Sequence, residues 1–203
     1  MVRLNGGQPT PNRCAMTLFE YLTVAVSIVL SFGLVRLLDG LRPAVSPRRA
    51  YWVHAVWVVI KLLNLVLFWW ALWNYREGVN WNLFLFAWVL LPPALLYLQA
   101  TALVTRSPDA VPDWQFHFYE IRQWFFAINV LLVTVTAIGT WMIGGVPLLH
   151  PLRGVQGILV GASVCGMLST SHRVHAVIVM ISLVTVLMGF GAVLFQAGAL
   201  RAG

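Results

Sequence analysis

Six long apolar runs, separated by short polar breaks, set the pattern of this chain. They cover residues 17–39, 51–73, 82–104, 118–143, 150–169 and 174–198. Each run has about the 20 residues that an α-helix needs to cross the hydrocarbon core of a bilayer. The breaks are rich in proline, glycine and arginine, which is typical of loops. The pattern therefore predicts an all-α fold: a single transmembrane domain over residues 1–203, built as a bundle of about six spanning helices.

The composition agrees with a membrane setting. Hydrophobic residues make up 60% of the 203 residues and charged residues only 9%, whereas soluble domains carry about 25% charged residues. The net charge of +7 does not indicate nucleic-acid binding, because the basic residues lie between the apolar runs rather than along one stripe. We therefore expect the lipid bilayer as a partner and expect no binding of nucleic acid.

Aromatic residues near the ends of the runs mark two membrane interfaces, which we call face A and face B. Face A carries Trp69, Trp70, Trp73, Tyr75, Trp81 and Trp141, and face B carries Tyr51, Trp52, Trp114 and Tyr119. The arginines of face B are Arg36, Arg42, Arg48, Arg49, Arg106, Arg122 and Arg173, against Arg3, Arg13, Arg76, Arg153 and Arg201 at face A. By the positive-inside rule face B is cytoplasmic, and an even number of spans places both termini at face A, in the periplasm.

One charged residue interrupts the second apolar run. Lys61 lies ten residues into that run, close to the bilayer midplane, where a lysine costs roughly 2.5–3.5 kcal/mol to insert. At matching depth the third run contains Pro92-Pro93, which frees the backbone carbonyls of Trp88 and Val89. Lys61, these carbonyls and Asn64 would form a polar path for an ion or solute. Alternatively, the lysine snorkels to an interface and the prolines only kink the helix.

A second group of polar side chains gathers near face B. Its members are Arg36, His54, Gln99, His117, Glu120, Arg122 and His175. They form either an interfacial ring of solvated or ion-paired groups, or a vestibule that opens toward Lys61 with His54 and His175 as titratable gates.

The histidines also raise the question of a cofactor. His172 and His175 are three residues apart on one side of a helix, and His54 belongs to the same interface. All lie at helix ends and no carboxylate completes a metal-binding spacing, so no cofactor is predicted. Haem or a metal ion at His54, His172 and His175 is the alternative.

Two further patterns concern the architecture. Val53-His54-Ala55-Val56 opens the second run and Val174-His175-Ala176-Val177 opens the sixth, which indicates either a parallel internal repeat or a chance match. The fifth run carries Gly157, Gly161 and Gly166, which permit close helix packing within the protein or at an oligomer interface.

Several short segments resemble a family. They are Phe19-Glu20-Tyr21, Ser27-Ile28-Val29-Leu30, Tyr51-Trp52-Val53-His54, Phe68-Trp69-Trp70 with Trp73, and Phe116-His117-Phe118-Tyr119 through Arg122-Gln123-Trp124-Phe125-Phe126. With them the chain resembles a widespread group of bacterial inner-membrane proteins of about this length and six spans, whose activity is not known. The resemblance implies a bacterial inner-membrane location and carries over no functional residue.

These features favour a channel or transporter for a small ion or solute, acting as a homo-oligomer or in a larger membrane complex. The alternative is a non-transporting membrane component, such as a sensor, an assembly factor or a complex subunit. A histidine-ligated redox or metal protein is the third class. The chain contains no P-loop, GxGxxG, HExxH or GxSxG motif, so no catalytic residue is predicted and an enzyme is not the expected function.

Overall fold

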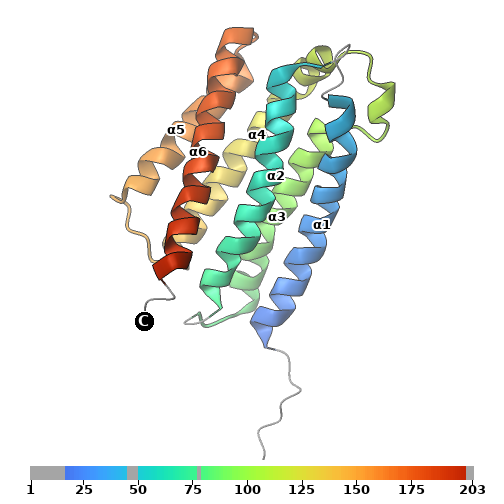
Figure 1. Ribbon diagram of the computed structural model, residues 1–203. Coiled ribbons are helices and arrows are strands. Elements are labelled where there is room, and N and C mark those ends of the chain that lie inside the picture. Colours follow the sequence, from blue (N-terminus) through green and yellow to red (C-terminus); the bar gives the residue numbers. More distant parts are fainter. Residues whose placement is uncertain (1–16, 45–49, 77–78, 200–203) are drawn as a thin grey trace, which may run out of the picture.

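The computed structural model describes residues 17–44, 50–76 and 79–199, with side chains up to residue 192. Within these residues the chain forms six α-helices and two short 3₁₀ turns (Figure 1). The helices are α1 (Leu18–Ala44), α2 (Trp52–Leu72), α3 (Leu83–Leu103), α4 (Trp114–Met142), α5 (Pro151–Leu168) and α6 (His172–Ala199). All six are long and apolar enough to cross a membrane, so the predicted all-α bundle of six spans is confirmed.

Two helices extend beyond their apolar runs. α1 continues past Asp39 to Ala44 rather than ending at residue 39. α4 begins at Trp114 rather than at residue 118, and Asp113 caps it by accepting a hydrogen bond of 2.7 Å from the backbone N–H of Gln115. Hydropathy marks only the part of a helix that lies in hydrocarbon, and these end turns carry polar side chains suited to the interface.

The helices alternate in direction, and α2 lies within the bundle. α1 contacts α2 and α3, α3 also contacts α4, α4 packs on α5, and α6 lies against α2 and α5 (Figure 1). The start of α1 and the end of α6 lie at the same end of the bundle, as an even number of antiparallel spans requires. Of the arginines counted for orientation, Arg3, Arg13, Arg48, Arg49 and Arg201 lie outside the described residues.

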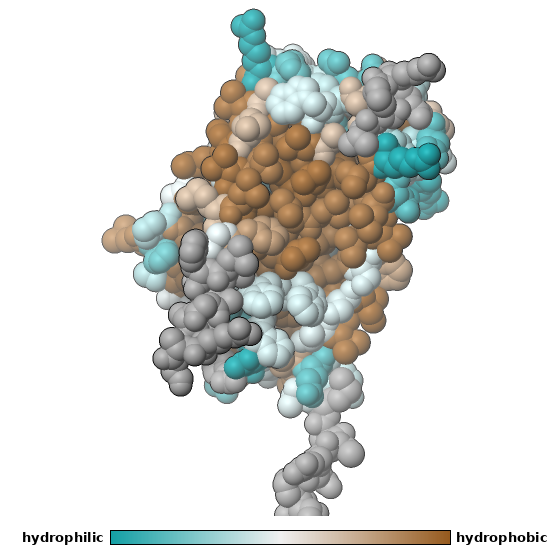
Figure 2. Space-filling model, viewed as in Figure 1, coloured by the Kyte–Doolittle hydropathy of each residue, from teal (hydrophilic) through white to brown (hydrophobic). Residues whose placement is uncertain are grey.

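The surface of the bundle is suited to lipid. Figure 2 shows a broad band of apolar side chains across the middle of the visible face, with hydrophilic side chains gathered toward the two ends. Phe32, Trp124 and Met188 are 64%, 65% and 68% exposed. Such extensive apolar exposure is unfavourable in water and is ordinary contact with lipid tails in a bilayer. The chain is a multi-pass integral membrane protein.

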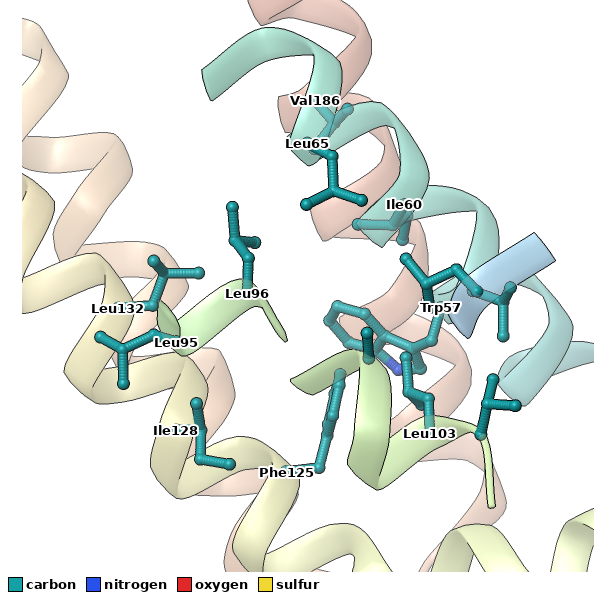
Figure 3. Packing of buried hydrophobic residues seen from close by; sticks show 14 of the residues in the cluster. Trp57, Ile60, Leu65, Leu95, Leu96, Leu103, Phe125, Ile128, Leu132 and Val186 are labelled. Atoms are coloured by element: carbon teal, nitrogen blue, oxygen red, sulfur yellow. The ribbon is translucent and has the colours of Figure 1, made fainter. Parts of the chain in front are cut away.

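An apolar core joins α2, α3 and α4. Trp57 of α2 points toward Phe125 of α4 (Figure 3), and their ring centroids are 5.0 Å apart at an interplanar angle of 71°. Leu96 and Leu103 of α3 belong to the same core, and all four side chains are buried. This packing fixes the positions from which polar side chains of the same helices reach the interior.

The glycines of α5 fall into two groups. A Cβ atom at Gly166 would lie 2.7 Å from the Phe126 ring of α4, so the missing side chain lets the two helices approach there. A Cβ atom at Gly157 or Gly161 would meet nothing within 4 Å. Close packing of α5 within the chain therefore involves Gly166, and an oligomer contact at Gly157 and Gly161 stays a prediction.

Candidate functional site

Lys61 is held inside the bundle. Its side chain is 2% exposed, and its Nζ donates a hydrogen bond of 2.8 Å to Oδ1 of Asn129 on α4. The rings of Trp57 and Phe125 have their centroids 5.3 and 5.4 Å from Nζ, which is within the range of cation–π attraction. The lysine thus has one polar partner and two aromatic neighbours in the interior.

Asn129 extends this contact into a network that joins four helices. Its Oδ1 also accepts a hydrogen bond of 3.0 Å from Nε2 of Gln99 on α3. Its Nδ2 donates to Oγ of Ser163 on α5 at 2.9 Å, and the Ser163 hydroxyl donates to the Leu159 carbonyl at 2.7 Å. Because an ammonium can only donate, the oxygen of the Asn129 amide must face Lys61. We call Lys61, Gln99, Asn129 and Ser163 the polar cluster.

The hydrogen bonds of the polar cluster leave donors, rather than acceptors, available to a ligand. Asn129 Oδ1 already accepts from both Lys61 and Gln99. The ammonium has three N–H donors, and among the described residues one of them is used. The Gln99 Oε1 has no hydrogen-bond partner there, but Gln99 is fully buried and does not line the adjoining cavity. A group that binds next to Lys61 must therefore accept hydrogen bonds.

No carboxylate balances the Lys61 charge within the described part of the chain. Glu20 accepts a hydrogen bond of 2.6 Å from the Thr17 amide at the start of α1, and Asp113 caps α4. Glu120 is exposed near face B. Glu20 and Asp113 thus serve helix ends and Glu120 lies at the surface, while the buried ammonium relies on a neutral amide and aromatic rings.

Lys61 and Asn129 line one end of a cavity of about 570 Å³. The cavity is enclosed by α2, α4, α5 and α6 and extends toward face A, where its lining includes Ala71 and Leu152. Most of the lining is apolar. Besides the two cluster residues, the polar lining residues are Asn64, Thr136, Gln156, Ser182 and Thr185.

The rim of this cavity lies at the lipid-facing surface where α5 and α6 meet. Val155 of α5 and Met188 of α6 line the cavity and are 36% and 68% exposed. Figure 1 shows these two helices side by side at one edge of the bundle. The cavity therefore has a lateral rim in the half of the bundle nearer face A.

The proline pair lies apart from this cavity. α3 runs without a break through Pro92 and Pro93, which are both buried. Pro92, Trp88 and Val89 line a second, smaller cavity of about 200 Å³ between α2, α3 and α4. Of the residues predicted for a polar path, Lys61 and Asn64 line the larger cavity, and these three line the smaller one.

The residues predicted near face B are divided by the structure. Gln99 belongs to the polar cluster, while His54 donates from Nε2 to the Leu103 carbonyl at 2.9 Å. The His54 ring stacks on Trp114 with ring centroids 4.6 Å apart, and the ring centroids of His54 and His117 are 6.1 Å apart.

The charged members of that group lie toward the interface. Arg122 donates from Nη1 to the Tyr119 carbonyl at 2.7 Å. Arg36 is half-buried, and its Nε has no hydrogen-bond partner among the described residues. No ion pair joins Glu120 to either arginine in the part of the chain described here. His54 and Arg122 are thus held by hydrogen bonds to backbone carbonyls, and His54 also by ring stacking.

His175 repeats the arrangement of His54. Its Nε2 donates to the Ser169 carbonyl at 3.0 Å, and its ring stacks on Phe126 with centroids 5.7 Å apart. Because a carbonyl only accepts hydrogen bonds, both histidines carry the proton on Nε2, and both Nδ1 atoms are buried without a partner in the described residues. Both histidines thus donate to a backbone carbonyl and stack on an aromatic ring, although the Leu103 carbonyl belongs to another helix and the Ser169 carbonyl lies just before the helix of His175.

His172 belongs to a separate contact at face B. Its Nδ1 lies 2.9 Å from the hydroxyl of Tyr51. Burial raises the pKa of Tyr51, and its hydrogen bond with Tyr119 raises this pKa further. Tyr51 therefore stays a neutral phenol able to donate to His172. Among the described residues no group of three histidine, cysteine or acidic side chains is placed to hold a metal ion.

An aromatic layer separates the polar cluster from face B. It consists of Trp57, Phe118, Phe125 and Phe126, all at most 1% exposed. Trp57 contacts Phe125 and Phe126 at centroid distances of 5.0 and 5.7 Å, and Phe118 contacts Phe126 at 6.4 Å. The cavity thus adjoins the cluster from the side of face A, while aromatic rings fill the bundle on the other side.

No family model, curated protein or solved structure matches this chain.

Two members of the polar cluster were not predicted from the sequence. Asn129 and Ser163 are two of several neutral polar residues in the fourth and fifth apolar runs. Their depth was the available signal, since both lie well inside helices. Depth does not say which helix faces which, so the sequence offered no means to connect them with Lys61.

Proposed function

We propose that the protein is a bacterial inner-membrane transporter for a small anionic solute, which binds at Lys61. The observation that carries the proposal is the cavity of about 570 Å³ that ends at this buried ammonium. Its volume falls in the range of roughly 300–1,000 Å³ typical of small-molecule sites. An ionisable residue that faces a cavity inside a membrane protein is characteristic of a substrate or ion pathway.

The cluster supplies a fixed binding point for such a solute. Asn129 orients the ammonium from α4, and Gln99 and Ser163 orient the Asn129 amide in turn. The ammonium of Lys61 has N–H donors that are not used by the cluster. Hydrogen bonds from these donors and the opposite charge compensate a bound anion for the water contacts that it loses.

Transport additionally requires access from face B. The aromatic layer closes that side, so Trp57 and Phe125 have to move for a solute to leave toward face B. In this mechanism the cavity in the half of the bundle nearer face A is one access state, and the polar cluster is the point around which access alternates.

Solid-supported-membrane electrophysiology on proteoliposomes tests the proposal. Formate, lactate and nitrate are applied in turn, and we expect at least one to produce a current that empty liposomes lack. Lys61→Met should reduce this current at least tenfold, because the aliphatic side chain keeps the shape but removes the charge. Ile158→Trp, at a lipid-facing position that is 58% exposed, is the control and should keep the current. Full current in Lys61→Met would refute the proposal.

The closed aromatic layer favours a second candidate, a sensor that binds a ligand without passing it. Such a protein needs the cavity and the polar cluster but no path beyond Trp57 and Phe125. The two candidates differ in one measurement: the sensor binds its ligand at Lys61, and the same ligand produces no current in proteoliposomes.

A further inference from the structure

We infer that the ligand of the larger cavity is a single-chain anionic amphiphile, with its carboxylate at Lys61 and its apolar chain along the cavity. This inference rests on the proposed function, because it names the class of anion that the same site takes. It draws on three independent features: the donors at the deep end, the apolar walls and the lateral rim.

The deep end of the cavity selects an anionic head group. Asn129 Oδ1 is occupied by two donors, and the ammonium of Lys61 has donors left over. Among the residues that the structure describes, no acidic side chain lines the cavity. A carboxylate supplies both the missing charge and the missing acceptors, whereas an alcohol supplies only acceptors and an ammonium ligand is repelled.

The walls of the cavity select an apolar body. Apart from a few amide and hydroxyl groups, the lining consists of side chains such as Leu67, Leu96, Leu132 and Val186. A small hydrophilic anion can bind at Lys61 and at a few amide and hydroxyl groups, but it leaves most of the apolar lining uncovered. An alkyl chain instead removes the apolar walls from contact with water.

The rim suits entry from the bilayer. Val155 and Met188 are exposed and line the cavity, so a lipid-dissolved molecule can reach the cavity between α5 and α6. The cavity volume of about 570 Å³ is that of a small-molecule site and suits one alkyl chain better than a two-chain phospholipid.

The sequence offers a direct probe of the head-group contact. Lys61 is the only lysine in the chain, so protein labelled with [13Cε]lysine gives one side-chain NMR signal. In lipid nanodiscs of phosphatidylcholine we expect dodecanoate to shift this signal saturably, and dodecanol and dodecylammonium to leave it unchanged. Equal shifts with dodecanol would overturn the assignment of an anionic head group.

Cavity variants test where the chain lies. Leu159 lines the cavity and its neighbour Ile158 faces lipid, so Leu159→Trp and Ile158→Trp form a matched pair. In equilibrium dialysis with radiolabelled dodecanoate, Leu159→Trp should weaken binding at least tenfold and Ile158→Trp less than twofold. Lys61→Met should also weaken it at least tenfold. Since Leu159→Trp keeps the lysine, the pair remains informative if Lys61→Met does not fold.

The outcomes separate the inference from the proposed function. Dodecanoate that binds at Lys61 but produces no current supports the inference and removes transport. A Lys61-dependent nitrate or formate current without dodecanoate binding keeps transport and overturns the inference. Phosphatidylglycerol that shifts the Lys61 signal and displaces dodecanoate would replace the single-chain ligand by a phospholipid, which also overturns it.

Discussion

Replacing Asn129 by leucine removes the centre of the polar cluster and should destabilise the protein strongly. The substitution keeps the branching at Cγ and the number of side-chain heavy atoms but deletes three hydrogen bonds, to Lys61, Gln99 and Ser163. Hydrogen bonds between membrane helices contribute about 0.6 kcal/mol each on average, which gives roughly 2 kcal/mol. The ammonium is then left without its polar partner, and an uncompensated buried charge raises the expected loss to roughly 3–5 kcal/mol.

The same argument predicts a partial rescue. In the double variant Asn129→Leu with Lys61→Met no buried charge remains, so the part of the loss that comes from the orphaned ammonium disappears. We expect the double variant to be more stable than Asn129→Leu alone by about 1–3 kcal/mol. A loss caused merely by poor packing of leucine would not be rescued by a change on another helix.

Reversible unfolding by SDS in mixed micelles, followed by tryptophan fluorescence, measures these differences. Thr134→Leu is the matched control, because Thr134 is exposed on α4 and bonds only to the Val130 carbonyl of its own helix. It should change the free energy of unfolding by less than about 0.5 kcal/mol. The reasoning fails if Asn129→Leu is as mild as this control, or if adding Lys61→Met makes the protein less stable still.

Three other variants examine the ligand charge, the helix packing and the loop between α4 and α5. Asn129→Asp should keep the fold but weaken dodecanoate binding at least tenfold in equilibrium dialysis, because its carboxylate takes the ammonium of Lys61. Gly166→Ala should cost about 1–3 kcal/mol in SDS unfolding, since its methyl group meets an aromatic ring at 2.7 Å, whereas Gly161→Ala should be neutral or stabilising by up to about 1 kcal/mol. Arg153 donates four hydrogen bonds of 2.8–2.9 Å around this loop, and a lysine there lacks the planar fork. Arg153→Lys should therefore speed amide exchange in residues 143–150 roughly tenfold.

The spans were predictable because hydropathy acts on each segment separately. A run of about 20 apolar residues has few alternatives to a spanning helix, and the six runs match the six helices closely. The differences lie where polar residues continue a helix beyond hydrocarbon, as Asp39 does in α1 and Asp113 at the start of α4. Such turns depend on capping and interfacial contacts, which hydropathy does not measure.

The site was predictable only in part, because its partners come from helices that are not neighbours in sequence. The insertion cost of a lysine singles out Lys61 without any structure. Counting residues outward from the loop between α2 and α3 compares membrane depth only within that hairpin. This comparison pointed to α3, and Gln99 of α3 does join the cluster. Asn129 lies on α4, and its contact with Lys61 depends on how the α2 and α4 helices cross, which no pattern in either helix encodes.

The position of Lys61 beside a cavity, rather than the energetics of the polar cluster, supports the proposal that its charge serves a ligand. Asn129, Gln99 and Ser163 could join three helices with neutral groups alone. Adding Lys61 costs roughly 2.5–3.5 kcal/mol on insertion, while one hydrogen bond between membrane helices returns at most about 1.7 kcal/mol. The two cation–π contacts, each worth about 0.5–2 kcal/mol, can close this gap and require no cavity. A lysine kept for packing would be enclosed on all sides, whereas Lys61 borders a cavity that an anion can enter.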